Sequence, residues 1–336
     1  MRLAVDVLGG DHAPQEILLG VAAALRSGEV RADQLLLVGP KDAATATLKD
    51  QGLADLPEIL PTEVVVEGHE SPIESLRRKP DSSVNLCVKA VAEGKAAGLL
   101  SFGNTGACVA AASIGLGMLE GIRRPGIAVS FNGIAGPFVM LDMGANPTPK
   151  PTHLFHYGLM GEAYARFLLG IDRVRIGLLN IGGEAGKGSP VAKEAHALLS
   201  KSALQFVGNI EGHDLFGGKA DVLVADGVVG NMVLKVVEGF AGYLLKEVGN
   251  MGSAAPESMR EAIGRLVGAS DYSEVGGATL MGVNGVVIIG HGRSQAHAVL
   301  PAMRTAFREI EKDVVRHTSE SLARHAGSDP AGESAG

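Results

Sequence analysis

Short apolar runs alternate with longer amphipathic segments along most of the chain. Runs such as residues 3–8 and 98–102 have the length and the mainly apolar character of buried strands in a parallel sheet. Glycine-containing turns follow these runs, and helix-length segments follow the turns. This alternation predicts an α/β fold, a mostly parallel sheet with helices on both faces.

The same pattern predicts the order of the elements. The expected strands are residues 3–8, 34–38, 63–67, 98–102, 127–131, 138–141, 174–180, 221–225 and 285–289. The expected helices are residues 72–79, 82–93, 105–119, 153–169, 230–248, 257–267 and 294–316, with one more that begins at Pro14 and another that ends near Gln51. We expect one catalytic domain over residues 1–326, with two lobes that meet near the proline-rich residues 147–152, and a disordered tail at 327–336.

Residues 96–119 carry no charge, and a segment of that length could cross a bilayer. The segment contains the turn sequence GNTG at 103–106, where an opened backbone would lack hydrogen-bond partners in lipid. We therefore predict a buried strand, a turn and a packed helix there. The N-terminal MRLAVDVLGGD is too short and too acidic for a signal peptide, so a cytoplasmic location is expected.

Composition narrows the class of protein. Of the 336 residues, 46% are hydrophobic, only 4% are aromatic and 47 are glycine, which favours α/β layering over an all-β sandwich. The net charge of −7 argues against a general nucleic-acid-binding protein. Two cysteines, Cys87 and Cys108, provide neither metal-site spacing nor a disulfide framework, and we expect no metal and no cofactor.

Six turns that follow predicted strands are candidates for ligand binding. They are residues 5–14, 101–107, 141–147, 179–189, 224–235 and 286–294. Ligands of open α/β sheets bind beyond the carboxyl ends of the strands, glycine lets the backbone approach a ligand closely, and helix N-termini favour anions. Each turn alone could be an ordinary turn, but six at one edge predict an anion site.

The segment GLLNIGGEAGKGSP at 177–190 resembles a phosphate-binding loop without matching the nucleotide-binding P-loop. That motif would need a glycine at position 181 and a residue with a hydroxyl group at position 188, where this chain has Ile181 and Gly188. Lys187, together with Asn231, could polarise an oxygen that gains charge in a transition state. The alternative for Lys187 is a solvated surface lysine. The nearest approach to a dinucleotide fingerprint, residues 115–121, lies within a predicted helix, which argues against a nicotinamide cofactor.

No covalent nucleophile stands out. Ser113 lies in the middle of a predicted helix, not on the strand-to-helix turn of a serine hydrolase. Cys108 lies near the start of that helix, where a thiol pKa can be lowered, but a small buried apolar residue is the favoured interpretation.

The motifs AVDVLGGDHAP, RRKPDSS, SFGNTGA, DMGAN, GLLNIGGEAGKG, ADGVVGNMVLK, YSEVGGATLMGVNG and HGRS resemble, in order, the motif series of the bacterial phosphate acyltransferase (PlsX) family. They span about residues 1–315. The resemblance implies transfer of a long acyl chain from acyl carrier protein to inorganic phosphate, which forms acyl phosphate for phospholipid synthesis. It also implies a three-layer α/β/α fold like that of isocitrate and isopropylmalate dehydrogenases and of phosphotransacetylases, and a homodimer.

The resemblance identifies Lys187 and Asn231 as the expected catalytic pair. It implies that the following residues bind substrate or phosphate or support the site: Asp6, Gly10, Asn104, Thr105, Gly106, Asp142, Asn146, Asn180, Glu184, Gly188, Asp226 and Gly230. Residues 77–79 and 123–124 are basic and could receive the acidic carrier protein; ordinary solvated helix ends are the alternative.

The sequence departs from the family in two places. Phe102 stands where the family more often has a small residue, and residues 249–272 are less basic than the amphipathic helices that the family uses for dimer packing and membrane docking. Transient association with the inner face of the membrane, or with a membrane acyltransferase, is a further expectation. The alternatives are a phosphotransacetylase that uses short-chain acyl-CoA, an NAD-dependent β-decarboxylating dehydrogenase, which shares the fold, and a non-catalytic scaffold.

Overall fold

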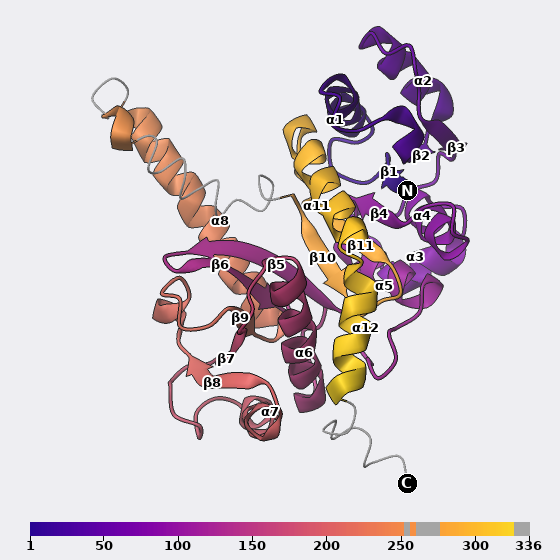
Figure 1. The fold of residues 1–336 in the computed structure, drawn as a ribbon. Coiled ribbons are helices and arrows are strands. Elements are labelled where there is room, and N and C mark those ends of the chain that lie inside the picture. The colour runs from indigo at the N-terminus through magenta and orange to yellow at the C-terminus, as the bar shows by residue number, and fades with distance from the viewer. Residues whose placement is uncertain (252–255, 260–275, 326–336) are drawn as a thin grey trace. The chain divides into compact units, whose positions relative to one another are not determined.

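The computed structural model describes residues 1–251, 256–259 and 276–325 (Figure 1). The chain forms two compact units: Met1–Leu119 with Gly276–Val315, and Glu120–Val275 with Arg316–Gly336. Each unit has its own part of the sheet and its own helices, and each is described by itself below.

The first unit contains a six-stranded arrangement in the order β3-β2-β1-β4-β11-β10. Its strands are β1 (Leu3–Asp6), β2 (Leu35–Gly39), β3 (Glu58–Pro61), β4 (Gly98–Ser101), β10 (Ala278–Met281) and β11 (Val286–Ile289). All neighbours pair in parallel except β10, which runs antiparallel to β11. Leu3, Ala4 and Val5 of β1 are fully buried, as expected for a central parallel strand.

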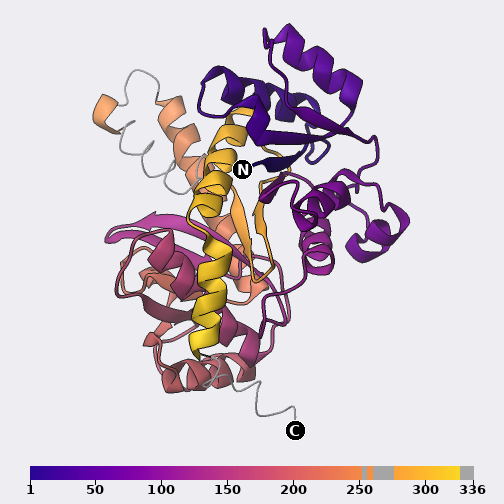
Figure 2. The same ribbon diagram turned by 45° about the vertical axis from the view of Figure 1, so that its right-hand side comes forward.

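Helices flank this arrangement. They are α1 (Gln15–Arg26), α2 (Lys41–Asp50), α3 (Pro72–Arg78), α4 (Ser83–Ala92), α5 (Thr105–Gly115) and α11 (Val299–Glu311). Helices α1 and α11 pack together, as do α4 and α5, and the two pairs cover the sheet of this unit (Figures 1 and 2). Three short 3-10 helices, Ala32–Gln34 and Ala296–Ala298 here and Gly212–Asp214 in the second unit, complete the described elements of this kind.

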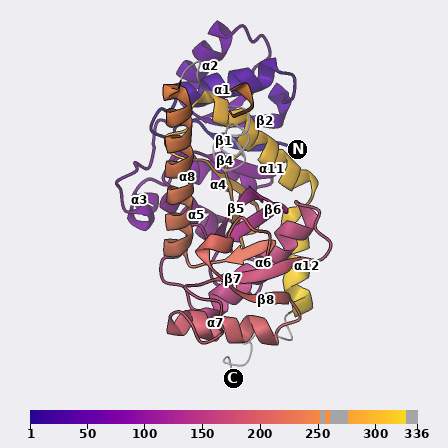
Figure 3. The same ribbon diagram turned by 90° about the vertical axis from the view of Figure 1, so that its left-hand side faces the viewer.

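The second unit has the strand order β5-β6-β9-β7-β8. Its strands are β5 (Gly126–Gly133), β6 (Gly136–Leu141), β7 (Arg175–Leu179), β8 (Gln205–Ile210) and β9 (Val222–Val224). β5 and β6 form an antiparallel hairpin, and the other pairs are parallel. Its helices are α6 (Pro151–Phe167), α7 (Pro190–Lys201), α8 (Gly227–Asn250) and most of α12 (Val314–His325). α6 and α7 pack together beside this sheet (Figure 3).

The fold class expected from the sequence is confirmed: both units are α/β with mostly parallel strands and flanking helices. Within residues 96–119 the predicted strand, turn and helix are present as β4 and α5, but the helix ends at Gly115 and not at residue 119. Among the described helices, α8 has the length and hydropathy for a membrane crossing, and 17% of its apolar window is buried.

Some predicted elements are wrong. Residues 63–67 form no strand; β3 lies earlier, at Glu58–Pro61. The carbonyl groups of Val64 and Val65 accept hydrogen bonds from the Ser83 N–H (2.9 Å) and the Lys79 ammonium (2.8 Å), so tertiary partners override the strand propensity of these valines. The predicted helix 294–316 is interrupted at Asp313, whose φ of 48° is left-handed.

Other elements were not predicted at all, namely α7, β8, β10 and the part of α12 beyond residue 316. The proline-rich run at 147–151 leads into α6 within the second unit. The single catalytic domain with lobes meeting near 147–152 stays a prediction. Residues 260–267 of the predicted helix 257–267, and the tail 327–336, lie outside the described residues.

Candidate active site

Three of the six predicted turns meet at one edge of the first unit. β1, β4 and β11 are parallel, so the turns that follow them begin at the same edge. The Asp11 N–H donates to the carbonyl oxygen of Gly292 (2.7 Å), and the Gly290 N–H donates to that of Ser101 (2.8 Å). The fold therefore brings turns 5–14, 101–107 and 286–294 together, as the topology of parallel strands requires.

Asp6 joins the first two of these turns. Its side chain is only 2% exposed. The Ser101 hydroxyl donates to Asp6 Oδ2 (2.7 Å) and accepts from the Gly103 N–H (3.1 Å), while the Leu8 N–H donates to Oδ1 (3.2 Å). Burial raises the pKa of the Asp6 carboxyl above its usual value. A Cβ at Gly9 would lie 2.7 Å from the Gly103 nitrogen, so glycine is needed for this close approach.

Gly10 and Phe102 lie on the same edge. Gly10 has a φ of +117°, which favours glycine, and its Cα faces Phe102 and the carbonyl of Gly292. The Phe102 side chain is buried and its ring occupies the space where a Cβ of Gly290 would be. Phe102 therefore fills a position inside the fold, against a glycine that makes room for it.

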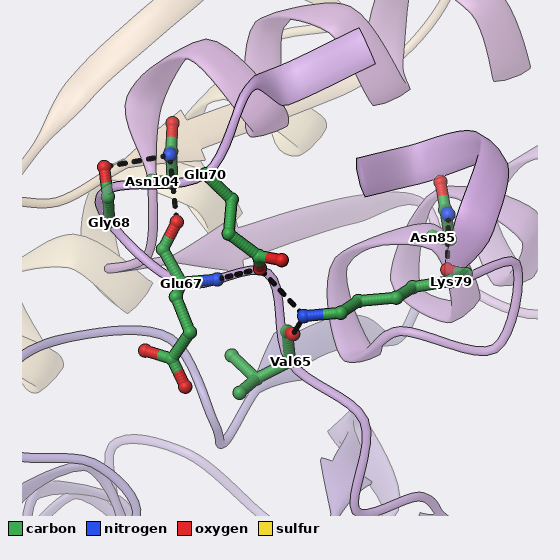
Figure 4. Close-up of polar contacts among 7 residues, drawn as sticks. All are labelled: Val65, Glu67, Gly68, Glu70, Lys79, Asn85 and Asn104. Atoms are coloured by element: carbon green, nitrogen blue, oxygen red, sulfur yellow. Dashed lines mark hydrogen bonds and ion pairs between the residues drawn. The ribbon is translucent and has the colours of Figure 1, made fainter. Parts of the chain in front are cut away.

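Asn104 is the N-cap of α5 and also holds a neighbouring loop (Figure 4). Its Oδ1 accepts from the Ala107 N–H (3.0 Å), and its Nδ2 donates to the carbonyl oxygens of Glu67 (3.1 Å) and Gly68 (3.2 Å). Thr105 follows as the first helical residue and is exposed. The next residue, Gly106, packs on Pro72, whose Cγ would be 2.8 Å from a Cβ at position 106.

The loop that Asn104 holds is fixed at its other end by Lys79 (Figure 4). The Lys79 ammonium donates to Glu70 Oε2 (2.6 Å) and to the carbonyl of Val65 (2.8 Å), and Glu70 Oε2 also accepts from the Glu67 N–H (2.7 Å). The Lys79 side chain is 30% exposed, and its ammonium group contacts other residues of this protein. Arg78, another basic residue of the run 77–79, forms an ion pair with Glu74.

Asp142 organises the turn after β6 in the second unit. It is fully buried. Its Oδ1 accepts from the backbone N–H groups of Ile127 (2.9 Å), Gly144 (3.1 Å) and Ala145 (2.9 Å), and its Oδ2 accepts from that of Asn146 (2.7 Å). Burial raises the pKa of the Asp142 carboxyl, and these hydrogen bonds oppose the rise. The N–H groups of this turn are thus already hydrogen-bonded to a carboxylate of the protein itself, that of Asp142.

Asn146 links this turn to two other segments. Its Nδ2 donates to the carbonyl of Pro125 (2.5 Å) and to the hydroxyl of Tyr157 (2.7 Å). Its own carbonyl accepts from the Gly227 N–H at the start of α8 (2.9 Å). Burial raises the pKa of the Tyr157 hydroxyl, so Tyr157 remains a neutral partner here.

Two glycines seat the first turn of α8 on the same segment. A Cβ at Gly227 would be 2.6 Å from the carbonyl oxygen of Asn146. A Cβ at Gly230 would overlap the carbonyl oxygen of Asp142 and lie 3.1 Å from the Cα of Met143. At these two positions there is no room for a side chain larger than a hydrogen atom. With glycine there, α8 approaches the turn more closely than it could with any other residue type.

Asp226 caps α8 and Asn231 follows one turn later. Asp226 Oδ1 accepts from the N–H groups of Val228 (3.0 Å) and Val229 (2.8 Å). Asn231 is exposed, and its side chain lies next to Gly144, whose added Cβ would be 3.7 Å from Asn231 Cβ and 3.9 Å from its Oδ1. The cap and the glycine contacts therefore present the Asn231 amide beside the turn after β6.

The loop after β7 is closed by Asn180. Its Oδ1 accepts from the Ile181 N–H (2.8 Å), and its Nδ2 donates to the carbonyl of Lys187 (3.1 Å). Gly188, with a φ of +86°, packs directly against the Asn180 side chain. A Cβ at that position would clash with Asn180 Oδ1, so both residues are needed for this closure.

The backbone of Lys187 is fixed by hydrogen bonds, and the residue is exposed. Its N–H donates to the carbonyl of Glu184 (3.0 Å), which also accepts from Asn209 Nδ2 (2.8 Å). Lys187 and Glu184 are both exposed, and both side chains lie near Gly182, where an added Cβ would be 3.0 Å from Lys187 Cγ and 3.1 Å from Glu184 Oε2. Within the described parts of the chain, the Lys187 ammonium and the backbone N–H groups of 182–186 have no hydrogen-bond partner. This loop can therefore offer several donors to an anion.

The structure thus gathers the predicted residues at two strand edges, one in each unit. The first unit holds Asp6, Gly10, Asn104, Thr105 and Gly106, and the second holds Asp142, Asn146, Asn180, Glu184, Lys187, Gly188, Asp226, Gly230 and Asn231. In the second unit β6, β9 and β7 are parallel neighbours, so the turns with Asp142, Asn231 and Lys187 begin at one edge. The partners Ser101, Pro125 and Tyr157 were not identified from the sequence.

The favoured interpretation of Cys108 is confirmed. Its side chain is fully buried, and burial together with the nearby Asp6 raises the pKa of its thiol. Ser113 donates to the carbonyl of Val109 within α5 (2.6 Å). Among the residues that the structure describes, no three His, Cys, Asp or Glu side chains are grouped as metal ligands.

Comparison with known proteins gives closely similar relatives along the whole chain. Residues 1–317 match a family model described as "Fatty acid synthesis protein". A phosphate acyltransferase of Desulfitobacterium hafniense (strain DSM 10664 / DCB-2) is 40% identical over 331 residues, which cover 96% of this chain and 98% of the relative. A phosphate acyltransferase of Pelotomaculum thermopropionicum is 42% identical over 331 residues, covering 96% of this chain and 95% of the relative.

Solved structures resemble the fold at much lower sequence identity. A branched-chain phosphotransacylase from Enterococcus faecalis V583 aligns with a TM-score of 0.59 and 17% identity, over 92% of this chain and 99% of its own. A putative 4-hydroxythreonine-4-phosphate dehydrogenase from Salmonella typhimurium aligns with a TM-score of 0.55 and 11% identity, over 91% of this chain and 98% of its own. At these identities the likeness concerns the fold alone, which agrees with the expected phosphotransacetylase-like and dehydrogenase-like architecture.

Proposed function

The chain belongs to the phosphate acyltransferase family and is an acyltransferase enzyme, and we propose that it transfers a long-chain fatty acyl group from acyl carrier protein to inorganic phosphate. The product would be an acyl phosphate for phospholipid synthesis. The observation that carries the proposal is the loop after β7. There the Lys187 ammonium and a run of N–H groups have no hydrogen-bond partner among the described residues, on a backbone fixed by Asn180 and Glu184.

The proposed reaction is a direct attack of phosphate on the thioester. Phosphate is mostly ionised near neutral pH, with a second pKa of about 6, so a phosphate oxygen needs orientation more than deprotonation. A phosphate oxygen adds to the carbonyl carbon, which forms the new C–O bond and places a negative charge on the carbonyl oxygen. When this oxyanion collapses, the C–S bond breaks and its electron pair leaves with the carrier's thiolate; a thiol has a pKa of about 8.5, so the thiolate is a tolerable leaving group. Orientation of the two reactants can contribute roughly 7–11 kcal/mol to lowering the barrier. No acyl-enzyme is required.

Lys187 and Asn231 are the proposed catalytic pair. Both side chains are exposed at the edge where β7 and β9 end, and both are donors that can stabilise the oxyanion of the thioester or hold the phosphate. Glu184 and Gly188 support Lys187 from within its loop. Asp142 is a positioning residue in this proposal, because its oxygens are occupied by the turn that lies against Asn231.

The remaining residues have two proposed roles. Asn146, Asp226 and Gly230 hold the start of α8 and thus position Asn231. Asn104 and Thr105, at the N-terminus of α5, are proposed to contribute to substrate binding, with Asp6, Gly10 and Gly106 shaping that edge.

We further propose a cytoplasmic homodimer that associates transiently with the inner face of the membrane or a membrane acyltransferase. The supporting observation is the apolar surface of α8. Its exposed side chains include Met232, Val236, Phe240 and Tyr243, each at least 55% exposed.

Phosphate-dependent thiol release from palmitoyl carrier protein tests the function, with Lys187→Ala as the test of the site. We expect the variant to lose about 10²–10³-fold in kcat, the usual cost of removing one oxyanion donor. Lys193→Ala, an exposed lysine on the next helix, is the matched control and should match the wild type.

The outcomes separate function from site. A wild-type protein that releases no thiol would overturn the function, and full activity of Lys187→Ala would overturn only the assignment of Lys187. A burst of thiol release without phosphate would contradict direct attack. Preference for acetyl-CoA over palmitoyl carrier protein would instead support a short-chain phosphotransacetylase.

A further inference from the structure

Two exposed arginines, Arg123 and Arg124, precede β5. β5 runs antiparallel to β6, so its first residues lie at the edge where β6 ends. The next residue, Pro125, is tied there by its carbonyl, which accepts from Asn146 Nδ2 (2.5 Å). The arginines therefore stand beside the turn 142–146, the same turn that lies against Asn231.

Lys150 adds a third positive charge at this place. It is exposed and forms the N-cap of α6. The Lys150 N–H donates to Nδ1 of His153 (3.1 Å). Burial first, and then the neighbouring His156, Arg124, Lys150 and Arg123, lower the pKa of His153 to about 4, so His153 is uncharged at neutral pH. Arg123, Arg124 and Lys150 are the side chains near this imidazole that are positively charged at neutral pH.

These three cations have no acidic partner in the described parts of the chain. The other basic run expected to receive the carrier protein, residues 77–79, differs: Lys79 pairs with Glu70 and Arg78 with Glu74. The chain as a whole has a net charge of −7, so an acidic protein would be repelled by most of it and attracted only where cations gather unpaired.

We propose that Arg123, Arg124 and Lys150 form the surface that binds the acidic carrier protein. The inference rests on the proposed function, which supplies the partner. A carrier bound here would deliver its thioester to the edge that carries Asn231 and the loop of Lys187. Exposed charges of this kind raise the association rate and make binding depend on salt.

The test is the double variant Arg123→Glu/Arg124→Glu, compared with Arg173→Glu. Arg173 is also exposed, but it precedes β7 and so lies at the opposite edge of the second unit's sheet. Affinity for holo-carrier protein is measured by fluorescence anisotropy at about 0.01 M and about 0.15 M ionic strength. The KM values for acyl carrier protein and for phosphate are measured in parallel.

We expect the double variant to bind the carrier at least about tenfold more weakly at low salt, with a flatter salt dependence. Its KM for acyl carrier protein should rise by a similar factor, while its KM for phosphate and its thermal midpoint stay near the wild-type values. Arg173→Glu should behave as the wild type.

Three results would overturn this docking surface: unchanged carrier affinity in the double variant, an equal loss in Arg173→Glu, or a wild type that does not bind the carrier. A raised KM for phosphate with unchanged carrier affinity would assign the arginines to free phosphate instead. A wild type that binds the carrier in this charge-dependent way but transfers no acyl group would overturn the proposed function and leave the docking surface standing.

Discussion

Asp6 and Asp142 show how single carboxylates shape the two strand edges. Asp6 is the last residue of β1 and Asp142 follows β6 directly. The oxygens of both accept hydrogen bonds from the protein itself, those of Asp6 from the Ser101 hydroxyl and Oδ1 of Asp142 from three backbone N–H groups. Burial raises the pKa of both carboxyls, and the hydrogen bonds that they accept oppose this rise. An acid in such a turn repels phosphate, and for this reason we assign both residues to positioning and leave anion binding to Lys187 and its loop.

Glu309 gives a prediction for the pH dependence of stability. It is 1% exposed on α11 and accepts a hydrogen bond from the Thr279 hydroxyl, and burial raises its pKa to about 8. Between the usual value of 4.5 and about 8 the folded state keeps a proton that the unfolded state has lost, so stability falls as pH rises through this range. Glu309→Gln retains an acceptor for Thr279 and cannot ionise.

We therefore expect the free energy of unfolding of Glu309→Gln to exceed that of the wild type increasingly between about pH 5 and about pH 9, by a few kcal/mol at the upper end. Denaturant unfolding at several pH values measures the difference. Parallel pH profiles for the two proteins would show that Glu309 does not titrate in this range.

At the scale of elements, the position of Asn231 depends on how the start of α8 packs against the turn after β6. A Cβ at Gly230 would overlap the carbonyl of Asp142, whereas one at Gly239 in the same helix would meet nothing within 4 Å. Gly230→Ala should therefore destabilise the protein by about 1–3 kcal/mol through overpacking. It should also lower kcat by tenfold or more, because the helix must move and Asn231 moves with it.

The matched control is Gly239→Ala, which should be neutral or more stable by up to about 1 kcal/mol, since alanine is the better helix former. Thermal unfolding and phosphate-dependent thiol release measure both effects. Wild-type activity in Gly230→Ala would mean that the close packing of α8 at Gly230 does not control the position of Asn231.

The elements that the sequence predicted well are those whose signal is local. The mainly apolar runs of β1, β4 and β11 identify central strands, and the glycine turns after them mark the edge. β8 was missed because half-exposed edge strands lack such a run, and 63–67 was misread because its valines have the propensity of a strand without strand neighbours. The partners of Asn146 lie 21 and 11 residues away, and only the folded chain brings them together.

At the scale of the whole chain, the two units repeat one principle. Each has parallel strands whose carboxyl ends carry glycine turns and a buried aspartate at the end of a strand. Each also has a helix capped by an Asn or Asp side chain, α5 by Asn104 and α8 by Asp226. The first unit's edge is held by side chains that bind backbone. In the second unit the exposed side chains of Lys187 and Asn231 follow two neighbouring parallel strands, and for this reason the catalytic pair is proposed there.

The exposed apolar face of α8 leads to a prediction for the assembly. Met232, Val236 and Phe240 recur every four residues, so they lie on one face of the helix, and each is about 60% exposed. A contiguous apolar face of this kind marks an interaction surface.

If this face of α8 is the dimer interface, Val236→Ser/Phe240→Ser should convert a wild-type dimer to a monomer in size-exclusion chromatography with light scattering, because the apolar area that drives association is lost. Val207→Ser, at a 41% exposed valine on β8, is the control and should remain dimeric. A wild type that is monomeric at micromolar concentration, or a double variant that stays dimeric, would contradict the prediction; binding of the monomer to anionic vesicles, lost in the double variant, would assign the face to the membrane.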